Sequence, residues 1–311
     1  MNYTEKNSLK ISQMTLGTVQ LGMSYGVNNS TGMPSEEDSF KILDTAYNNG
    51  ITMLDTSDDY GKSEEVIGKY IKTNPDKSFD ICTKFKVTEA TSNDIYASLR
   101  DFALKSAKKL NIESIPIFMC HTEQNYLDYG KKLTDALDEL KKEGIIINSG
   151  ISLSRKDELN RIADSGKFDA IQMPMNIFDN KEIIDGTIDR ISSNGIAIFI
   201  RSVYLQGLFF KQSASLKGTN LDIAIPYIEK LNEVAKDNQI SVAQLALSFI
   251  RDSKGVDSLV VGSETPEQVD QNVQMFTTPA LSSKTLENIY DIFASVDKYI
   301  VSPWLWSKPR T

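Results

Sequence analysis

The sequence predicts an α/β protein built as one (β/α)8 barrel, the TIM-barrel fold, that spans residues 1–311 as a single domain. Segments with the pattern of buried strands alternate with helix-like segments along the whole chain. The strand-like segments number eight, which is the number that such a barrel needs. No linker, low-complexity tract or change of composition marks a second domain, and a length of 311 residues is usual for one barrel.

The predicted strands are short apolar runs bounded by polar residues or glycine. Within a barrel, helices cover one side of each strand and interior side chains the other, so both faces should be apolar. The runs at 115–120 and 197–200 show this pattern most clearly. We predict strands over residues 15–19, 52–55, 80–84, 115–120, 145–149, 170–173, 197–201 and 258–261.

The segments between the strands have helical patterns. Ser35, with Asp38 three residues later, has the spacing of a helix start for segment 35–49. Apolar residues recur at helical spacing over 133–140, and Gly144 suits the position just past the end of that helix. Helices are also predicted over 223–237 and 284–296.

Two segments are longer than the connections of a barrel require, namely the loop 204–220 and a C-terminal tail from about 298. The tail carries both tryptophans, Trp304 and Trp306. We expect it either to contribute to a substrate pocket or to pack against the barrel.

Composition argues against several classes of function. A net charge of -8 is unsuited to binding nucleic acid or an anionic membrane surface. No apolar stretch is long enough to span a bilayer, and the first residues lack the apolar core of a signal peptide. Cys82 and Cys120 fall on predicted buried strands, so we expect reduced core thiols and a cytoplasmic protein. A single histidine argues against a metal site, and none is expected.

Charged or titratable residues stand at the ends of successive predicted strands. Asp55, Lys84 and His121 each close an apolar run, and Tyr60 lies in the loop after Asp55. Barrel enzymes place their chemistry at these strand ends. An ammonium group beside a tyrosine lowers the phenol pKa toward the range of a useful proton donor. The four residues therefore predict a proton-transfer site suited to reducing a carbonyl group.

Structural interpretations of the same residues remain open at this point. Asp55 and Lys84 can form a plain salt bridge at the barrel rim, His121 can be a hydrogen-bonded structural histidine, and Tyr60 can be a loop aromatic. The proton-transfer interpretation is favoured because all four fall at strand ends or in the adjoining loop.

A second motif follows the last predicted strand, at residues 260–268. Thr265 suits the N-cap of a helix, Pro266 its first position, and Gln268 would complete a capping box. The turn at Gly262 leads into a helix N-terminus, where free backbone N–H groups can bind a phosphate. The alternative is an ordinary, well-capped turn.

With these residues, the sequence resembles the aldo-keto reductase superfamily over nearly its whole length. The family's aspartate, tyrosine, lysine and histidine tetrad matches Asp55, Tyr60, Lys84 and His121 in order and approximate spacing. The resemblance implies that Tyr60 is the general acid, that Lys84 lowers its pKa, that Asp55 supports Lys84, and that His121 orients the carbonyl. Local strings also match at 16–18, 49–56, 60–61, 150–152, 171–176 and 262–272.

The resemblance also implies a nicotinamide cofactor, a small-molecule carbonyl substrate and a monomeric protein. NADPH is the cofactor expected from family habit, and NADH is the alternative. Neither nucleic acid nor a membrane is expected as a partner. The residues that would bind the cofactor are Gly17, Thr18, Ser152, Gln172, Asn176, Arg201, Ser202, Leu205, Gly207, Gly262, Ser263, Gln268 and Asn272.

Three features depart from the family's common pattern. Ser152 is followed by Leu153 rather than by asparagine. Arg201 stands where an aromatic residue often stacks on the nicotinamide, and we hypothesise that its charge disfavours the cationic, oxidised cofactor. The segment 262–272 contains acidic residues and no lysine or arginine that would favour a 2′-phosphate.

Two other functions fit the same fold. A regulatory barrel would sense the redox state of its cofactor while bound to a partner, and an intact tetrad argues against this role. A Schiff-base lyase would use Lys84 as its nucleophile. Asp55 beside Lys84 would keep that amine protonated, which is wrong for a nucleophile.

Overall fold

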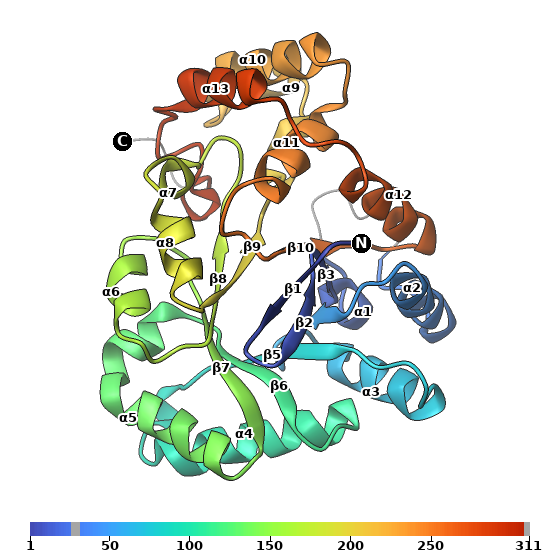
Figure 1. The fold of residues 1–311 in the computed structure, drawn as a ribbon, viewed down its shortest axis with the longest axis vertical. Helices are drawn as coiled ribbons and strands as arrows, with labels where there is room; N and C mark the ends of the chain where they lie inside the picture. Colours follow the sequence, from blue (N-terminus) through green and yellow to red (C-terminus); the bar gives the residue numbers. More distant parts are fainter. Residues whose placement is uncertain (26–31, 308–311) are drawn as a thin grey trace.

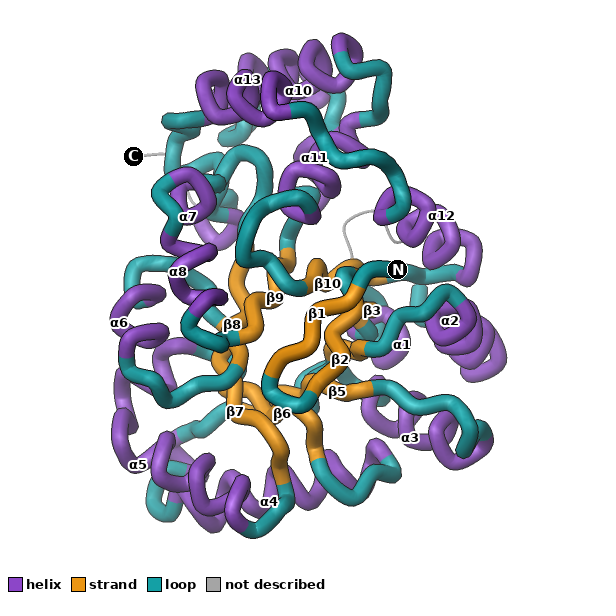
Figure 2. Tube along the Cα trace, viewed as in Figure 1, coloured by secondary structure: helices purple, strands orange, loops and turns teal. Residues whose placement is uncertain are grey.

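The computed structural model describes residues 1–25 and 32–307, and its central feature is a closed barrel of eight parallel strands. The strand order is β10-β3-β4-β5-β6-β7-β8-β9, and the pairing of β10 with β3 closes the barrel. Helices surround the strands (Figures 1 and 2), which confirms the predicted fold class. The barrel strands are β3 (Met14–Gly17), β4 (Met53–Asp55), β5 (Asp80–Phe85), β6 (Ile115–Cys120), β7 (Ile146–Ser152), β8 (Ala170–Pro174), β9 (Ala197–Arg201) and β10 (Ser258–Gly262).

The eight predicted strands are all present, with ends that differ from the prediction by at most three residues. The largest difference is in β7, which continues to Ser152 because its residues 150–152 pair with residues 170–172 of β8. The pairing places Ser152 beside Gln172 at the C-terminal end of the barrel.

The predicted helices are present as well. Ser35 caps α2 (Glu36–Asn48), and its hydroxyl accepts a hydrogen bond from the Asp38 N–H at 3.1 Å. Gly144 has a φ of +72° just after α5 (Glu123–Lys142), which is the left-handed conformation expected there. The other helices of eight or more residues are α3 (Ser63–Thr73), α4 (Ile95–Leu110), α10 (Ile225–Asp237), α11 (Val242–Arg251), α12 (Pro266–Phe276) and α13 (Ser283–Phe293); the short ones are α1 (Val19–Gly22), α6 (Leu159–Asp164), α7 (Lys181–Ile184), α8 (Thr187–Ser193) and α9 (Ser213–Leu216), with 3-10 turns at Glu89–Thr91, Leu205–Phe210, Asp222–Ala224 and Pro303–Leu305.

Helix α12 begins where the sequence predicts, but its capping differs in one respect. The Thr265 hydroxyl caps the helix by accepting the Gln268 N–H at 3.3 Å. The predicted capping box is wrong, because Gln268 Oε1 accepts the N–H of Glu264 at 2.7 Å instead of turning back to Thr265.

The sequence interpretation missed an N-terminal hairpin formed by β1 (Tyr3–Lys6) and β2 (Leu9–Ser12). Its two-residue turn, Asn7-Ser8, has a positive φ at both positions, as a type I′ turn requires. Asn-Ser is a weaker signal for this turn than Asn-Gly, which is the physical reason that the pattern was overlooked.

The hairpin closes the N-terminal end of the barrel (Figure 1). Leu9 and Ile11 are buried and belong to one apolar cluster with side chains of the barrel interior. The Asn7 amide donates to the carbonyl of Asp169, just before β8 begins, at 2.9 Å. A closed N-terminal end leaves the C-terminal end of the strands for a binding site.

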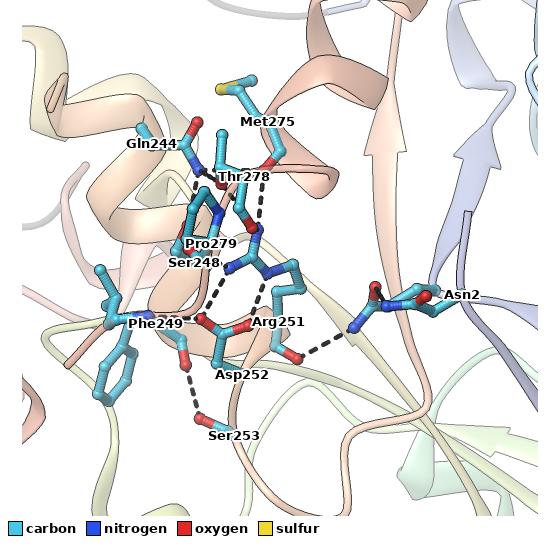
Figure 3. A network of polar contacts seen from close by, with 12 residues as sticks. Asn2, Gln244, Ser248, Phe249, Arg251, Asp252, Ser253, Met275, Thr278 and Pro279 are labelled. Carbon is cyan, nitrogen blue, oxygen red and sulfur yellow. Dashed lines mark hydrogen bonds and ion pairs between the residues drawn. The ribbon is translucent and has the colours of Figure 1, made fainter. Parts of the chain in front are cut away.

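A buried polar network joins the end of α11 to the segment between α12 and α13 (Figure 3). The Arg251 side chain is 3% exposed and forms two bonds with the carboxylate of Asp252, at 2.6 and 2.8 Å. Its other N–H groups donate to the carbonyls of Met275, Thr278 and Pro279 at 2.9 to 3.1 Å. This network holds the C-terminal end of α12 in place.

The described part of the C-terminal tail packs on the apolar core. Ile300 is fully buried, and the Trp306 indole donates to the carbonyls of Tyr299 and Ile300 at 3.1 and 3.2 Å. Within residues 1–25 and 32–307, no helix has both the length and the apolar character that crossing a membrane requires.

Candidate active site

The C-terminal ends of three adjacent strands bring the predicted tetrad together. Asp55 ends β4, Lys84 lies near the end of β5, and His121 directly follows β6. Tyr60 lies in the turn between β4 and α3. Because β4, β5 and β6 are hydrogen-bonded neighbours, residues far apart in the chain meet at one edge of the barrel.

Asp55 and Lys84 form a buried ion pair. Lys84 Nζ lies 2.6 Å from Asp55 Oδ1 and donates a second bond to the Thr56 carbonyl at 2.9 Å. The same Asp55 oxygen accepts from the Gln172 amide at 2.7 Å. Burial by itself would lower the pKa of Lys84, but the charge of Asp55 and its hydrogen bond, together with Tyr60 and Cys82, outweigh it and the pKa is raised. Lys84 is therefore a fixed positive charge rather than a free amine.

The loop that carries Tyr60 is held by a close contact between two glycines. A Cβ on Gly22 of α1 would lie 1.8 Å from the Tyr60 carbonyl oxygen, so no larger residue fits there. Gly61 has a φ of +56°, and the Lys62 N–H donates to the Gly22 carbonyl at 3.2 Å. This contact fixes the backbone on both sides of the phenol.

The charge of Lys84 acts on Tyr60, whose ring centroid is 5.3 Å from Lys84 Nζ. Lys84 lowers the pKa of Tyr60, but burial and the charge of Asp55 raise it, and the net pKa is above its ordinary value. Lys84 acts in the expected direction, but the expected net lowering of the pKa of Tyr60 is wrong. The phenol therefore keeps its proton at neutral pH.

His121 is a neutral imidazole. Burial and the charges of Lys84 and Lys86 lower its pKa from 6.5 to about 4. Its Nδ1 lies 3.3 Å from the Ser57 hydroxyl and 3.3 Å from a carboxylate oxygen of Asp59. Its ring packs edge-on against that of Tyr60, with centroids 6.0 Å apart. Contacts at Nδ1 leave Nε2 as the nitrogen that is available to a ligand.

A cleft of about 830 Å³ opens beside these residues. Asp55 and Tyr60 line it, and they contact Lys84 and His121, which are not part of the lining. Ser152, Asn176, Leu205 and Ser263 are buried outside the lining, and no residue of the described tail reaches it. The predicted site residues that line the cleft are Gly17, Thr18, Asp55, Tyr60, Gln172, Arg201, Ser202, Gly207, Gly262, Gln268 and Asn272.

Sequence reasoning missed several residues that line this cleft. Gln20 and Tyr204 each bury an oxygen that has no hydrogen-bond partner among the described residues. Gln20 follows Thr18 closely after the first barrel strand, and Tyr204 lies within the string 201–207, so both positions were close to predicted ones. Buried polar atoms without partners are rare, and in a cleft they mark positions where a ligand can supply the missing bond.

The segment after β9 has an unusual backbone. Ser202, Leu205 and Gln206 all have positive φ values, between 46° and 64°, although none is glycine. Such conformations are uncommon for residues with a Cβ, and they cluster at binding and active sites. This segment forms one wall of the cleft.

The start of α12 contributes another part of the cleft lining. Its backbone N–H groups are already engaged: that of Glu264 bonds Gln268 Oε1, and that of Gln268 bonds the Thr265 hydroxyl. The pKa of Glu267 is lowered by its own backbone N–H and by Thr265, so its carboxylate uses the donors of this turn. The helix start therefore offers an anion fewer free donors than the sequence predicted.

A comparison with protein families assigns the chain. The model of the aldo/keto reductase family matches residues 13–293. The chain therefore belongs to the aldo/keto reductase family, and the resemblance found in the sequence is confirmed. Members of this family are oxidoreductases that use nicotinamide cofactors and act on small carbonyl compounds.

Individual relatives agree with this assignment. The uncharacterized oxidoreductase YqkF of Bacillus subtilis is 25% identical over 315 residues, which cover 91% of this chain and 96% of the relative. The NADH-specific methylglyoxal reductase of Escherichia coli is 23% identical, with 86% and 92% covered. The holo form of aldo-keto reductase AKR11C1 from Bacillus halodurans shares the fold, with a TM-score of 0.77 at 20% identity, over 96% of this chain and 99% of that one.

Proposed function

We propose that the protein reduces an aldehyde or ketone to an alcohol, with Tyr60 as the proton donor. A nicotinamide bound in the cleft would supply a hydride, that is, one proton with two electrons, to the carbonyl carbon. Tyr60 would give its phenolic proton to the carbonyl oxygen, so the products are an alcohol and the oxidised cofactor. The observation that carries this proposal is the contact of Lys84, Tyr60 and His121 at one edge of the cleft.

The electrostatics of the tetrad suit this role. Tyr60 holds its proton at rest, because its pKa is raised. When negative charge builds on the substrate oxygen and the proton leaves, the nearby Lys84 ammonium stabilises the phenolate that remains. The ion pair with Asp55 keeps Lys84 charged and in place. A neutral His121 can donate from Nε2 to the substrate oxygen when the Ser57 hydroxyl donates to Nδ1.

The cleft also has features that fit a nicotinamide cofactor. The oxygens of Gln20 and Tyr204, which have no partner among residues 1–25 and 32–307, could form hydrogen bonds with polar groups of a bound cofactor. At Gly262 a Cβ would lie 2.5 Å from the Gln20 amide, so glycine keeps the strand end and Gln20 in close contact. Gln172, Gln268 and Asn272 add amide groups to the same lining. We assign the adenosine end of the cofactor to Gly262, Gln268 and Asn272.

We propose NADH, rather than the NADPH expected from family habit, as the preferred cofactor. A 2′-phosphate needs charged donors, and residues 262–272 contain no lysine or arginine. Glu264 lines the cleft at this point, where a carboxylate can accept a hydrogen bond from a ribose hydroxyl but repels a phosphate. The name of the relative from Escherichia coli, an NADH-specific reductase, agrees with this choice.

The raised pKa of Lys84 counts against the lyase alternative, because a protonated amine cannot attack a carbonyl. No feature of the cleft, as its described residues form it, favours a role as a cofactor sensor over catalysis. A monomeric state and a cytoplasmic location stay predictions from the sequence.

Fluorescence titration with NADH and NADPH, followed by turnover with a panel of carbonyl compounds, tests the proposal. We expect NADH to bind more tightly and Tyr60→Phe to lower kcat by about 100- to 10,000-fold. The dissociation constant of the cofactor in Tyr60→Phe serves as the control and should not change. Failure of both cofactors to bind would contradict the proposed function, and a kcat within tenfold of the wild type would exclude Tyr60 as the acid.

A further inference from the structure

We propose that Arg201 forms a binding site for a carboxylate group of the substrate, so that the enzyme acts on small aldehydes or ketones that carry an acidic group. This inference rests on the proposed carbonyl reduction and names its class of substrate. It is carried by a guanidinium that lines the cleft and has no carboxylate partner in the part of the chain that the structure describes.

The hydrogen bonds of Arg201 hold the side chain but leave several of its N–H donors without an acceptor among the described residues. Nη2 donates to the Leu153 carbonyl at 2.9 Å, and Nη1 makes a long contact with the Ser202 hydroxyl at 3.4 Å. A guanidinium has N–H donors on all three nitrogens. The Nε–H group and one N–H on each Nη therefore have no acceptor among the described residues.

The nearby carboxylates are engaged elsewhere. Asp55 is paired with Lys84 and accepts from Gln172. Glu123 accepts the backbone N–H groups of Ser154 and Arg155 at 2.9 and 3.2 Å. No aspartate or glutamate forms an ion pair with Arg201 in the described part of the chain, and positions 26–31 and 308–311 contain neither residue.

A partly buried charge without a counter-ion is unfavourable in a folded protein. Burial lowers the pKa of Arg201, which is the effect expected when surrounding carboxylates do not compensate the lost hydration. Arginine is also the side chain best shaped to bind a carboxylate through two parallel N–H groups. An anionic ligand would therefore supply both the missing charge and the missing acceptors.

Arg201 belongs to the proton-donor end of the cleft. Its charge lowers the pKa of Tyr60, and Tyr60 and Asp55 in turn raise the pKa of Arg201. A carbonyl held at Tyr60 and an anion held at Arg201 can thus belong to one small molecule. The cofactor diphosphate is the other anion that could reach this guanidinium. The guanidinium reaches from β9 past β8 to the Leu153 carbonyl after β7, away from β10 and the start of α12, and this placement favours the substrate.

The test compares two aldehydes of equal chain length, succinic semialdehyde and butanal. Because the net charge of -8 opposes an anionic substrate in general, a preference for the acid requires a local cation. We expect kcat/KM to favour succinic semialdehyde by about ten- to a hundredfold, the value of a hydrogen bond to a charged group. In Arg201→Met this ratio should fall close to one, mainly through KM, and Arg201→Lys should keep part of it.

A matched control is Lys211→Gln, which removes an exposed positive charge outside the cleft lining and should keep the wild-type ratio. Circular dichroism checks that each variant is folded. An equal kcat/KM for both aldehydes in the wild type would overturn the inference while the proposed reduction stands. If Arg201→Met instead weakens cofactor binding and slows both aldehydes by the same factor, Arg201 serves the cofactor diphosphate and the inference is wrong.

A binding measurement separates this inference from the proposed function. Calorimetric titration with 4-hydroxybutyrate and with 1-butanol, the two alcohol products, needs no turnover. We expect 4-hydroxybutyrate to bind the wild type and not Arg201→Met, and 1-butanol to bind both only weakly. If no carbonyl compound is reduced but this pattern holds, the anion site stands without the proposed reaction. If 4-hydroxybutyrate binds both proteins equally, the anion site is wrong.

Discussion

Two arginines of this barrel differ in how far the surrounding chain satisfies their hydrogen-bond donors and their charge. Arg251, at the end of α11, makes two bonds to Asp252 and donates its remaining N–H groups to backbone carbonyls of the segment 275–279 (Figure 3). Arg201, at the end of β9, has one firm bond, to the Leu153 carbonyl, and no carboxylate partner among the described residues. The first network is complete within the protein, and the second is not.

The difference separates a structural side chain from one that can bind a ligand. A buried charge stabilises a fold only when its hydrogen bonds and its counter-ion are both supplied by the protein. Arg251 meets that condition at 3% exposure. Arg201 lines a cleft that also contains the unpartnered oxygens of Gln20 and Tyr204. The side chains with missing partners line the cleft at the C-terminal end of the barrel, whereas Arg251 and Asp252 are not part of the cleft lining.

The largest effect on stability is expected from Arg251→Met. The change leaves the partly buried Asp252 carboxylate, which is 14% exposed, without its ion-pair partner and frees the carbonyls that hold the end of α12. We expect the free energy of unfolding to fall by about 3 to 5 kcal/mol, as for other broken buried pairs. Urea unfolding monitored by circular dichroism measures the loss. A loss below about 1 kcal/mol would mean that the network is not a structural one.

A smaller effect on stability is expected from the titration of His121, which follows β6 at the C-terminal end of the barrel. Its pKa is about 4 in the folded protein and 6.5 as a reference. Between these values the unfolded chain binds a proton that the folded protein does not, so stability falls as the pH drops. We expect the free energy of unfolding to decrease by about 1 kcal/mol for each pH unit below 6.5, in addition to any change from other groups. Urea unfolding at a series of pH values measures this slope.

The control for the pH series is His121→Gln, which replaces the only histidine of the chain. This variant should lose the additional slope between pH 6.5 and 5.5, whereas Arg251→Met should keep it, since His121 contacts Ser57, Asp59 and Tyr60 and is not part of the Arg251 network. Equal slopes in wild type and His121→Gln would show that the histidine is not buried in its neutral form.

The smallest effect is expected from Arg201→Met. Loss of one bond to Leu153 is offset by removal of an uncompensated, partly buried charge. The free energy of unfolding should change by no more than about 1 kcal/mol in either direction. Urea unfolding beside Arg251→Met gives a direct comparison. A loss as large as that of Arg251→Met would make Arg201 structural and remove the contrast between the two arginines.

Much of the fold could be predicted because its signals are local. Each barrel strand is a short apolar run, and the caps of α2 and α12 depend on residues three positions apart. The tetrad could be placed because parallel strands bring their C-terminal ends to one edge. The N-terminal hairpin was missed because its turn, Asn7-Ser8, carries only a weak pattern.

Other features could not be predicted because they depend on what surrounds a side chain in three dimensions. The pKa of Tyr60 is lowered by Lys84 and raised by burial and by Asp55. The extent of burial cannot be predicted from the residues next to Tyr60 in the sequence. The Gln268 side chain had two possible backbone partners within reach, and the geometry of the turn selected Glu264. Gln20 and Tyr204 became candidates only once their oxygens were seen to be buried.

The sequence by itself determined the barrel, the order of its strands and the four titratable residues at one end, since these follow from periodicity and from the positions where apolar runs stop. Only the tertiary structure decided that Arg251 has a carboxylate partner and acceptors for its N–H groups, and that Arg201, among the described residues, lacks that partner and most of those acceptors. Arg251 finds carbonyl partners 24 to 28 residues away, and the one backbone partner of Arg201 is 48 residues away. Partners at such separations are brought together by packing, and no local pattern records them.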